Sequence, residues 1–138
     1  MNDSSSAART PAPAPLIARI LLALVFLVSG VRSLGAVAGT AGYLARLGVP
    51  MPEIMAWVVI IVEILGAIVL IVGWKTRLAA WVLVAFVVVA TLLAHRFWAG
   101  DPAQYVNQLN HFLKNLAMIG GLLLVAVHGP GRLALDRR

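Results

Sequence analysis

Four long apolar runs dominate the pattern of hydrophobic and polar positions along the chain. They cover residues 16–34, 54–73, 78–95 and 109–128, and short segments with Gly, Pro and charged side chains separate them. A helix of about 20 residues, rising about 1.5 Å per residue, matches the ~30 Å hydrocarbon core of a bilayer. The pattern therefore predicts an all-α membrane protein, a four-transmembrane-helix antiparallel bundle.

The segments outside these runs divide the chain into three parts. Residues 1–15 are rich in Ser, Ala and Pro and are predicted to be a disordered leader, with its prolines blocking any backward extension of the first helix. The membrane domain covers residues 16–131, and residues 132–138 are expected to form a short basic tail. Arg19, one turn into the first run, is expected to extend to the membrane interface.

A cleaved signal peptide within residues 1–38 is an alternative interpretation of the first run. Residues 20–31 would be its apolar region, and Ala36-Val37-Ala38 imitates a cleavage site. Arg32 interrupts the passage between these two features, and the Pro-rich leader is unusual before a signal peptide. The membrane-spanning interpretation is therefore favoured.

The composition supports a membrane protein and excludes several other classes. Hydrophobic residues make up 62% of the chain and charged residues 12%, and the mean hydropathy is +0.96. Soluble domains are closer to half apolar and a quarter charged. The chain has no cysteine, which excludes disulfides, thiol redox chemistry and Cys-based zinc sites. The net charge is +6, but the basic residues are dispersed, so nucleic acid is not an expected partner.

The basic residues at the ends of the runs predict the orientation of the bundle. Four spans place both termini on one side, and cytoplasmic segments carry the excess of Lys and Arg. We therefore expect a multi-pass membrane protein with both termini in the cytoplasm. The side with the termini holds Arg9, Arg19, Lys75, Arg77, Arg132, Arg137 and Arg138, and the other side holds Arg32, Arg46 and Arg96.

Glu63, in the middle of the second run, is the most informative polar residue. A bare carboxylate at that depth costs roughly 2.5 kcal/mol or more, so it is expected to be paired, protonated or next to a polar cavity. Counted from the outer side, Glu63 lies about 14 Å down its helix and Lys114 about 8 Å down the fourth helix. The two side chains would meet if these helices were neighbours.

Other polar residues extend this candidate site in the outer half of the bundle. His111, Lys114 and Asn115 share one face of the fourth helix because of their i, i+3, i+4 spacing. Two roles stay open for Glu63 and its neighbours, a structural ion pair or a ligand and proton site. A metal site is not expected, and Asn115 is expected to form a helix–helix hydrogen bond. The full set of candidate residues is Glu63, Lys114, His111, Asn115, Arg32, His95 and Arg96.

Several motifs along the chain together resemble a known family. They are Arg19 with Phe26 and Gly30; Leu47-Gly48-Val49-Pro50; Glu63-x-x-Gly66; Gly73-x-x-Thr76-Arg77-x-Ala79-Ala80; His95-x-Phe97-Trp98; His111-Phe112-x-Lys114-Asn115-Leu116-Ala117 with Gly120-Gly121; and Gly129-Pro130-Gly131 leading to Leu135-Asp136. With these motifs the chain resembles the DoxX family of small bacterial membrane proteins from about Ala18 to Asp136. Arg32 departs from the Lys found in many relatives but keeps the positive charge.

This resemblance implies a four-helix membrane bundle and a link to redox systems. Some relatives are connected with sulfur-compound oxidation that feeds quinones, or with membrane oxidoreductase complexes. The bundle also resembles that of vitamin K epoxide reductases, but their cysteine chemistry cannot transfer to a chain without cysteine.

Three classes of function stay open. The first is a quinone-associated subunit or accessory of a membrane oxidoreductase system, with electrons supplied by a membrane or soluble partner because the chain encodes no redox centre. The second is a non-catalytic scaffold or a protein that binds a lipid-like ligand. The third is a small transporter or proton pathway, for which four spans are few unless the protein forms a homo-oligomer.

Overall fold

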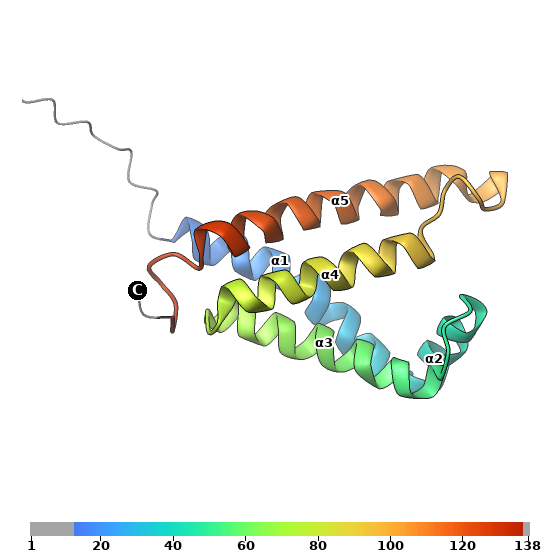
Figure 1. The fold of residues 1–138 in the computed structure, drawn as a ribbon, viewed down its shortest axis with the longest axis horizontal. Coiled ribbons are helices and arrows are strands. Elements are labelled where there is room, and N and C mark those ends of the chain that lie inside the picture. The colour runs from blue at the N-terminus through green and yellow to red at the C-terminus, as the bar shows by residue number, and fades with distance from the viewer. Residues whose placement is uncertain (1–12, 137–138) are drawn as a thin grey trace, which may run out of the picture.

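The computed structural model describes residues 13–136, and these residues are helical with short connections (Figure 1). The elements follow in the order α1 (Ala14–Leu34), α2 (Val37–Arg46), α3 (Pro52–Val72), α4 (Thr76–Ala94), the short 3-10 helix η1 (Pro102–Gln104) and α5 (Tyr105–His128).

Four of these helices are long and apolar enough to cross a membrane, namely α1, α3, α4 and α5 with η1. Their outward surfaces carry large apolar side chains, including Leu21, Ile54, Leu78 and Leu124, each about 60% exposed. Such surfaces are unfavourable in water and fit the hydrocarbon of a bilayer. The predicted all-α fold with four spans is confirmed.

All four long helices begin earlier than predicted, by two residues in α1, α3 and α4 and by four in α5, and α3 and α4 also end one residue earlier. α1 begins at Ala14, inside the segment predicted as a leader, because Pro15 lies in the first turn, where a missing N–H costs nothing. α5 begins at Tyr105, four residues early, directly after η1, whose start is capped by the Asp101 side chain. The rest of the predicted leader, residues 1–12, lies outside the described residues.

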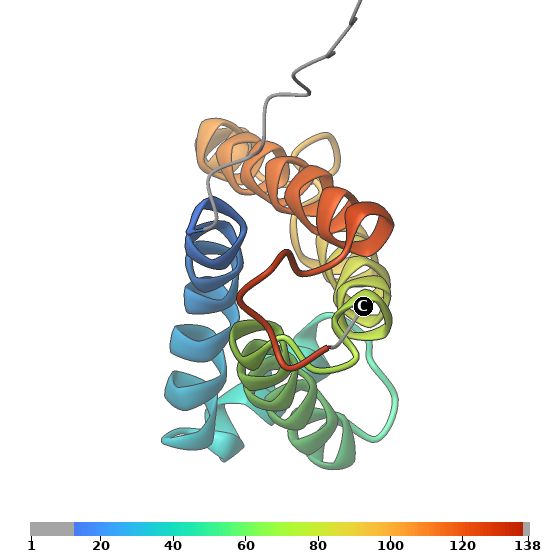
Figure 2. The ribbon, with the colours of Figure 1, turned by 90° about the vertical axis from the view of Figure 1, so that its left-hand side faces the viewer.

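The four long helices are arranged in a ring in the order α1, α3, α4, α5 (Figure 2). α1 packs closely on α3, and α4 packs closely on α5, while α3 and α4 form an antiparallel hairpin. α2 packs on α3 at the end of the bundle away from the termini. α3 and α5 lie diagonally opposite and make no contact with each other.

Small residues on the inward faces let the helices approach closely. Ala56 and Ala67 of α3 are fully buried, as the small-residue face around Glu63 predicts. A methyl group on Gly66 would lie 2.8 Å from Leu83 of α4, and one on Gly30 of α1 would lie 2.6 Å from Ile64 of α3. These two glycines therefore set the spacing of α3 to both of its neighbours.

The C-terminal tail, residues 131–136, packs against the α3–α4 turn and crosses the end of the ring (Figure 2). The backbone N–H groups of Leu135 and Asp136 donate to the carbonyls of Val72 and Gly73 at 3.2 and 2.7 Å. Gly73 has φ +75°, and a methyl group there would lie 2.5 Å from Ala134. The tail is therefore part of the folded bundle up to Asp136; residues 137 and 138 lie outside the described residues.

Asp136 fixes this tail by capping α4. Its carboxylate accepts hydrogen bonds from the backbone N–H groups of Lys75 (2.6 Å) and Thr76 (2.8 Å) and from the Thr76 hydroxyl (2.7 Å). The first N–H groups of a helix have no partner within it, so a remote carboxylate satisfies them here. The same hydrogen bonds, with that from the Thr76 backbone first, lower the pKa of Asp136 below its ordinary value.

Arg19 contradicts the prediction that it extends to the membrane interface. Its side chain is fully buried and donates hydrogen bonds to the carbonyls of Leu70 and Ile71, each at 2.8 Å, and to that of Leu133 in the tail. The carbonyls at the end of a helix lack intrahelical partners, and a guanidinium can bind several of them at once. Arg19 therefore joins α1, the end of α3 and the tail instead of reaching outward.

Candidate functional site

Glu63 is buried in the interface between α1 and α3, at 7% exposure. Its Oε1 accepts a hydrogen bond from the Ser29 hydroxyl of α1 at 2.8 Å, and its Oε2 is buried without a hydrogen-bond partner. No described Lys or Arg forms a salt bridge with it. A structural ion pair with Lys114 or Arg32, one of the two roles left open for Glu63, is therefore not formed within residues 13–136, and the Ser29 hydroxyl contacts the carboxylate instead.

The ring order explains why Glu63 and Lys114 do not pair. Lys114 is on α5, diagonally opposite α3, and the prediction required these two helices to be neighbours. Both Lys114 and Arg32 are exposed on the surface of the bundle. The depths of Glu63 and Lys114 along their helices are compatible with a contact, but depth along a helix does not say which helices are adjacent.

The other predicted polar residues lie between α4 and α5. The His95 and His111 rings stack with their centroids 4.9 Å apart, and His95 Nδ1 lies 2.9 Å from Gln108 Oε1. Asn115 donates to the Thr91 hydroxyl at 2.8 Å, which confirms the predicted helix–helix hydrogen bond. The candidate set is thus divided into an α1–α3 part around Glu63 and an α4–α5 part around the histidines.

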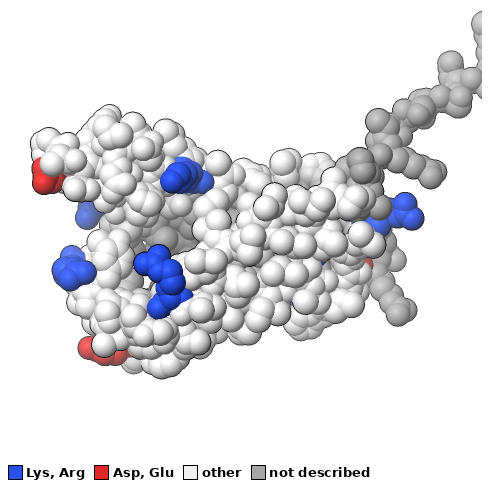
Figure 3. Space-filling model, turned by 180° about the vertical axis from the view of Figure 1, so that it is seen from behind, with Lys and Arg blue, Asp and Glu red and all other residues white. Residues whose placement is uncertain are grey.

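The end of the bundle away from the termini combines basic and aromatic side chains. Figure 3 shows a hollow at this end with Lys and Arg side chains beside it. Arg32, Arg46 and Arg96 lie at or just after the ends of α1, α2 and α4. Phe97 makes edge-on contacts with Trp98, Tyr105 and Phe112, an aromatic cluster that suits a membrane interface. Within residues 13–136 no three His, Asp or Glu side chains are grouped so that they could hold a metal ion.

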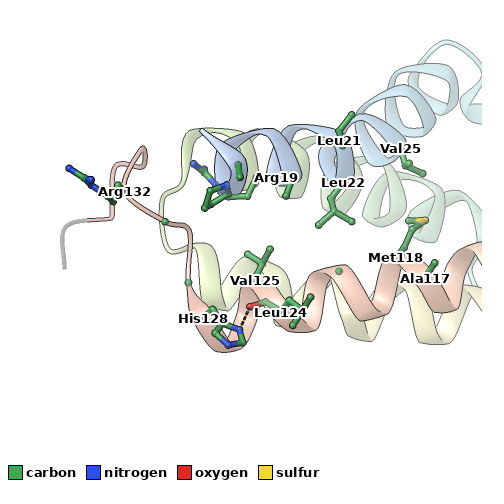
Figure 4. A pocket seen from close by; sticks show the side chains of 16 residues that line it. Arg19, Leu21, Leu22, Val25, Ala117, Met118, Leu124, Val125, His128 and Arg132 are labelled. Carbon is green, nitrogen blue, oxygen red and sulfur yellow. Dashed lines mark hydrogen bonds between the residues drawn. The ribbon is translucent and has the colours of Figure 1, made fainter. Parts of the chain in front are cut away.

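The bundle contains a cavity of about 1180 Å³ between α1 and α5, at the end where the termini lie (Figure 4). Its walls are mainly apolar, with Leu22 and Val25 from α1 and Met118 and Val125 from α5. Leu21 and Leu124 also line it and are more than 60% exposed, so the cavity opens on the lipid-facing side of the bundle. We call this space the α1–α5 cavity.

Three basic residues are among those at the termini end of the α1–α5 cavity: Arg19, His128 and Arg132. Arg19 is fully buried, and the Arg132 side chain points away from the cavity (Figure 4). His128 Nδ1 lies 3.1 Å from the Leu124 carbonyl, which can only accept a hydrogen bond. The ring is therefore held with Nδ1–H as the donor, which leaves Nε2 free to accept a hydrogen bond. Apolar walls with a few polar groups at one end are typical of sites for small amphipathic molecules.

None of the residues proposed from the sequence lines this cavity. The sequence contained one partial signal for it, because Arg19 is a rare charge within a span. Arg19 was interpreted differently, as a side chain that extends to the membrane interface. Arg132 belongs to the tail, and no pattern in the sequence brings a tail residue under α1.

Comparison with known proteins identifies relatives across most of the chain. The family model described as DoxX matches residues 14–96. The inner membrane protein YphA of Escherichia coli (strain K12) is 37% identical over 125 residues, covering 89% of this chain and 88% of its own length. The inner membrane protein YqjF of the same strain is 36% identical and covers 88% of both chains. No solved structure matches the chain.

Proposed function

The chain belongs to the DoxX family of integral membrane proteins, and we propose that it binds a lipid-like amphiphile in the α1–α5 cavity. The observation that carries this proposal is the cavity itself, about 1180 Å³ of mainly apolar space that opens toward lipid and ends at basic residues. Sites for drug-sized ligands usually measure roughly 300–1,000 Å³, so the space suits a larger, elongated molecule.

The packing of the ring supports this site. α1 and α5 are neighbours with few close approaches, whereas α1 with α3 and α4 with α5 are tightly packed. A molecule between α1 and α5 would fill the one weak seam of the ring and bury apolar surface on both helices, worth roughly 25 cal/mol per Å². The tail covers the end of this seam, so the opening lies on the side.

The cellular setting is part of the same proposal. The relatives YphA and YqjF are named inner membrane proteins, and the basic residues favour cytoplasmic termini. The basic end of the α1–α5 cavity would then lie at the cytoplasmic surface of the inner membrane, and the apolar part would extend toward the middle of the bilayer.

A tryptophan scan of exposed alanines tests the cavity. Ala117 is exposed on α5 and lines the cavity, so Ala117→Trp fills the space without displacing a buried side chain. Ala85 is exposed on α4 outside the cavity, so Ala85→Trp is the matched control. Native mass spectrometry of protein purified in mild detergent should show a lipid-sized adduct of one per chain in the parent and in Ala85→Trp, and a loss of that adduct in Ala117→Trp. An adduct unchanged by Ala117→Trp, or a parent protein without any adduct, would refute the proposal and leave the scaffold role.

A second candidate is that the amphiphile is a quinone held for a membrane oxidoreductase. The observation that favours it is His128, whose free Nε2 can accept a hydrogen bond from a quinol hydroxyl at the end of the apolar cavity. The partner enzyme would supply the electrons, because this chain has no cysteine and no grouped metal ligands among residues 13–136. Solvent extraction and chromatography test this: we expect about one quinone per parent chain and less in His128→Leu. Phospholipid without quinone in the extract would exclude this candidate while leaving the cavity proposal intact.

A further inference from the structure

We propose that Glu63 is a proton-binding site inside the bundle, with a neutral carboxyl group that carries its proton on Oε2 and accepts the Ser29 hydrogen bond on Oε1. This inference goes beyond the proposed function and is independent of it, because Glu63 does not line the α1–α5 cavity. It is carried by the burial of the Glu63 carboxyl group, by the single donor that contacts it and by the positions of the charged residues on the neighbouring helices.

The two carboxyl oxygens of Glu63 have different surroundings. Oε1 accepts a hydrogen bond from the Ser29 hydroxyl at 2.8 Å, whereas Oε2 is buried and has no hydrogen-bond partner among residues 13–136. An ionised carboxylate only accepts hydrogen bonds, at about four sites, and a buried charge needs a cation or several donors to replace its hydration. One hydroxyl donor is too few for an anion. A neutral acid has no net charge, so it costs much less to bury, even with an unbonded Oε2–H.

The space around Glu63 is apolar and closely packed. Glu63 lies near the middle of α3, one of the four helices long enough to span a membrane. On the same face of α3, Ile60 and Ala67 are buried at 2% and 0% exposure. A methyl group on Gly30 of α1 would lie 3.1 Å from Cβ of Glu63, so α1 leaves little free space beside this side chain. An unpaired charge is most costly at such a position within hydrocarbon, and the neutral acid avoids that cost.

Among residues 13–136, no charged group on the neighbouring helices compensates for an anion at Glu63. α3 packs against α1, α2 and α4. Arg19 of α1 is fully buried, but its guanidinium binds carbonyls at the C-terminal end of α3. His95, directly after α4, stacks on His111 of α5. The remaining charged or titratable side chains on these three helices are exposed and form no ion pair with Glu63, namely Arg32 on α1, Tyr43 and Arg46 on α2, and Arg77 on α4. A bound proton therefore supplies the missing positive charge.

Infrared spectroscopy detects this proton without requiring a reagent to reach the buried group. A protonated carboxylic acid has a carbonyl band that is separate from the bands of a carboxylate and of the peptide amides. The sequence has two glutamates, Glu53 and Glu63, so cell-free synthesis with glutamate labelled with carbon-13 at the side-chain carboxyl marks these two acids. The isotope shifts the band of a labelled acid and leaves the ester bands of any bound lipid in place.

At neutral pH we expect the labelled parent protein in detergent to show the isotope-shifted band of one protonated acid per chain. The band should be lost completely in Glu63→Gln and retained at full intensity in Glu53→Gln. Glu53 is the matched control, because it is the same residue type on the same helix but is exposed in the first turn of α3. Ser29→Ala should move the band to higher wavenumber, because the carbonyl oxygen Oε1 loses its hydrogen bond.

Each result supports or overturns the inference. A parent protein without the isotope-shifted acid band at neutral pH would overturn it, because Glu63 would then be ionised. A band that survives in Glu63→Gln and disappears in Glu53→Gln would place the proton on the wrong residue. A band that does not move in Ser29→Ala would refute the assignment of the two oxygens. If Glu63→Gln does not fold, Glu53→Gln still decides the question, because Glu63 is then the one glutamate in the chain. These measurements do not involve lipid retention, so the cavity proposal is tested separately.

Discussion

Replacing Asp136 with alanine should release the C-terminal tail from the bundle while leaving the four spans folded. The carboxylate accepts three hydrogen bonds from Lys75 and Thr76, all at 2.6–2.8 Å, and two of them come from backbone N–H groups at the start of α4. Removing the side chain that caps a helix start costs about 0.5–2 kcal/mol. We take the upper value because the acceptor is charged and makes three bonds.

This cost converts into a measurable change in local opening. At about 1.4 kcal/mol per factor of ten, a loss of about 2 kcal/mol increases the open fraction of the tail and the α4 start roughly 30-fold. Hydrogen–deuterium exchange with mass spectrometry, on protein in detergent micelles, reports this directly. Peptides covering residues 72–80 and 131–136 should exchange about 30-fold faster in Asp136→Ala, and peptides from the middle of α3 and α5 should not change.

Asp101 provides the matched control for this experiment. Its carboxylate also caps a helix start, by accepting a hydrogen bond from the Ala103 backbone at 3.0 Å, but at the other end of the bundle. Asp101→Ala should accelerate exchange only around η1. If Asp101→Ala shows its local effect while Asp136→Ala leaves residues 72–80 fully protected, the capping role of the tail is wrong.

Three further predictions follow from the contacts described above. Acidification should mimic Asp136→Ala, because the pKa of Asp136 is lower in the folded than in the unfolded protein. The stabilisation by its carboxylate is complete above the unfolded pKa of about 3.9 and is lost as the pH falls through the folded pKa. Hydrogen exchange of the tail should therefore accelerate in that pH range in the parent and not in Asp136→Asn. Gly66→Ala should lower the Tm measured by circular dichroism, because the new methyl group lies 2.8 Å from Leu83. Leu83→Ala also destabilises, because Leu83 is fully buried, but the losses should be less than additive in the double variant, where the close contact is absent; an additive loss would contradict this close approach. Glu63→Gln should keep its helix content and Tm, because the amide oxygen still accepts a hydrogen bond from Ser29 and no ion pair is broken. Ser29→Val should lower the free energy of unfolding by about 1–3 kcal/mol, because it removes the single hydrogen-bond donor to a buried carboxyl group. A large loss of stability in Glu63→Gln would point to a charge partner outside residues 13–136.

The family motifs acquire a physical explanation at the termini end of the bundle. Arg19, Gly73, Thr76, Gly131 and Asp136 are widely separated in the chain, yet they form one set of contacts. Two glycines at positive φ allow the turn and the tail to approach, and one basic and one acidic side chain bind the free backbone groups of α3 and α4. In this chain, these residues therefore explain how the tail closes the bundle.

The sequence by itself determined the elements that depend on local chemistry. The four apolar runs predicted the four spans, because bilayer thickness and helix rise decide how many apolar residues are needed. Asn115 was correctly expected to form a hydrogen bond with another helix, because it is a polar residue within a span. Periodicity along one helix is sufficient for these statements.

Tertiary structure alone decided which helices are neighbours and what the tail does. The ring order separates α3 from α5, so Glu63 pairs with Ser29 instead of Lys114. Hydrophobic patterning cannot supply that order, because the lipid-facing and the inward-facing surfaces of all four spans are both mainly apolar. Arg19 also shows why position along a helix is insufficient: its charge is held inside the bundle by carbonyls from a helix end and a tail that lie 51 to 114 residues away in the chain. The α1–α5 cavity results from the same long-range arrangement, since it exists only where two helices that are distant in sequence fail to pack closely.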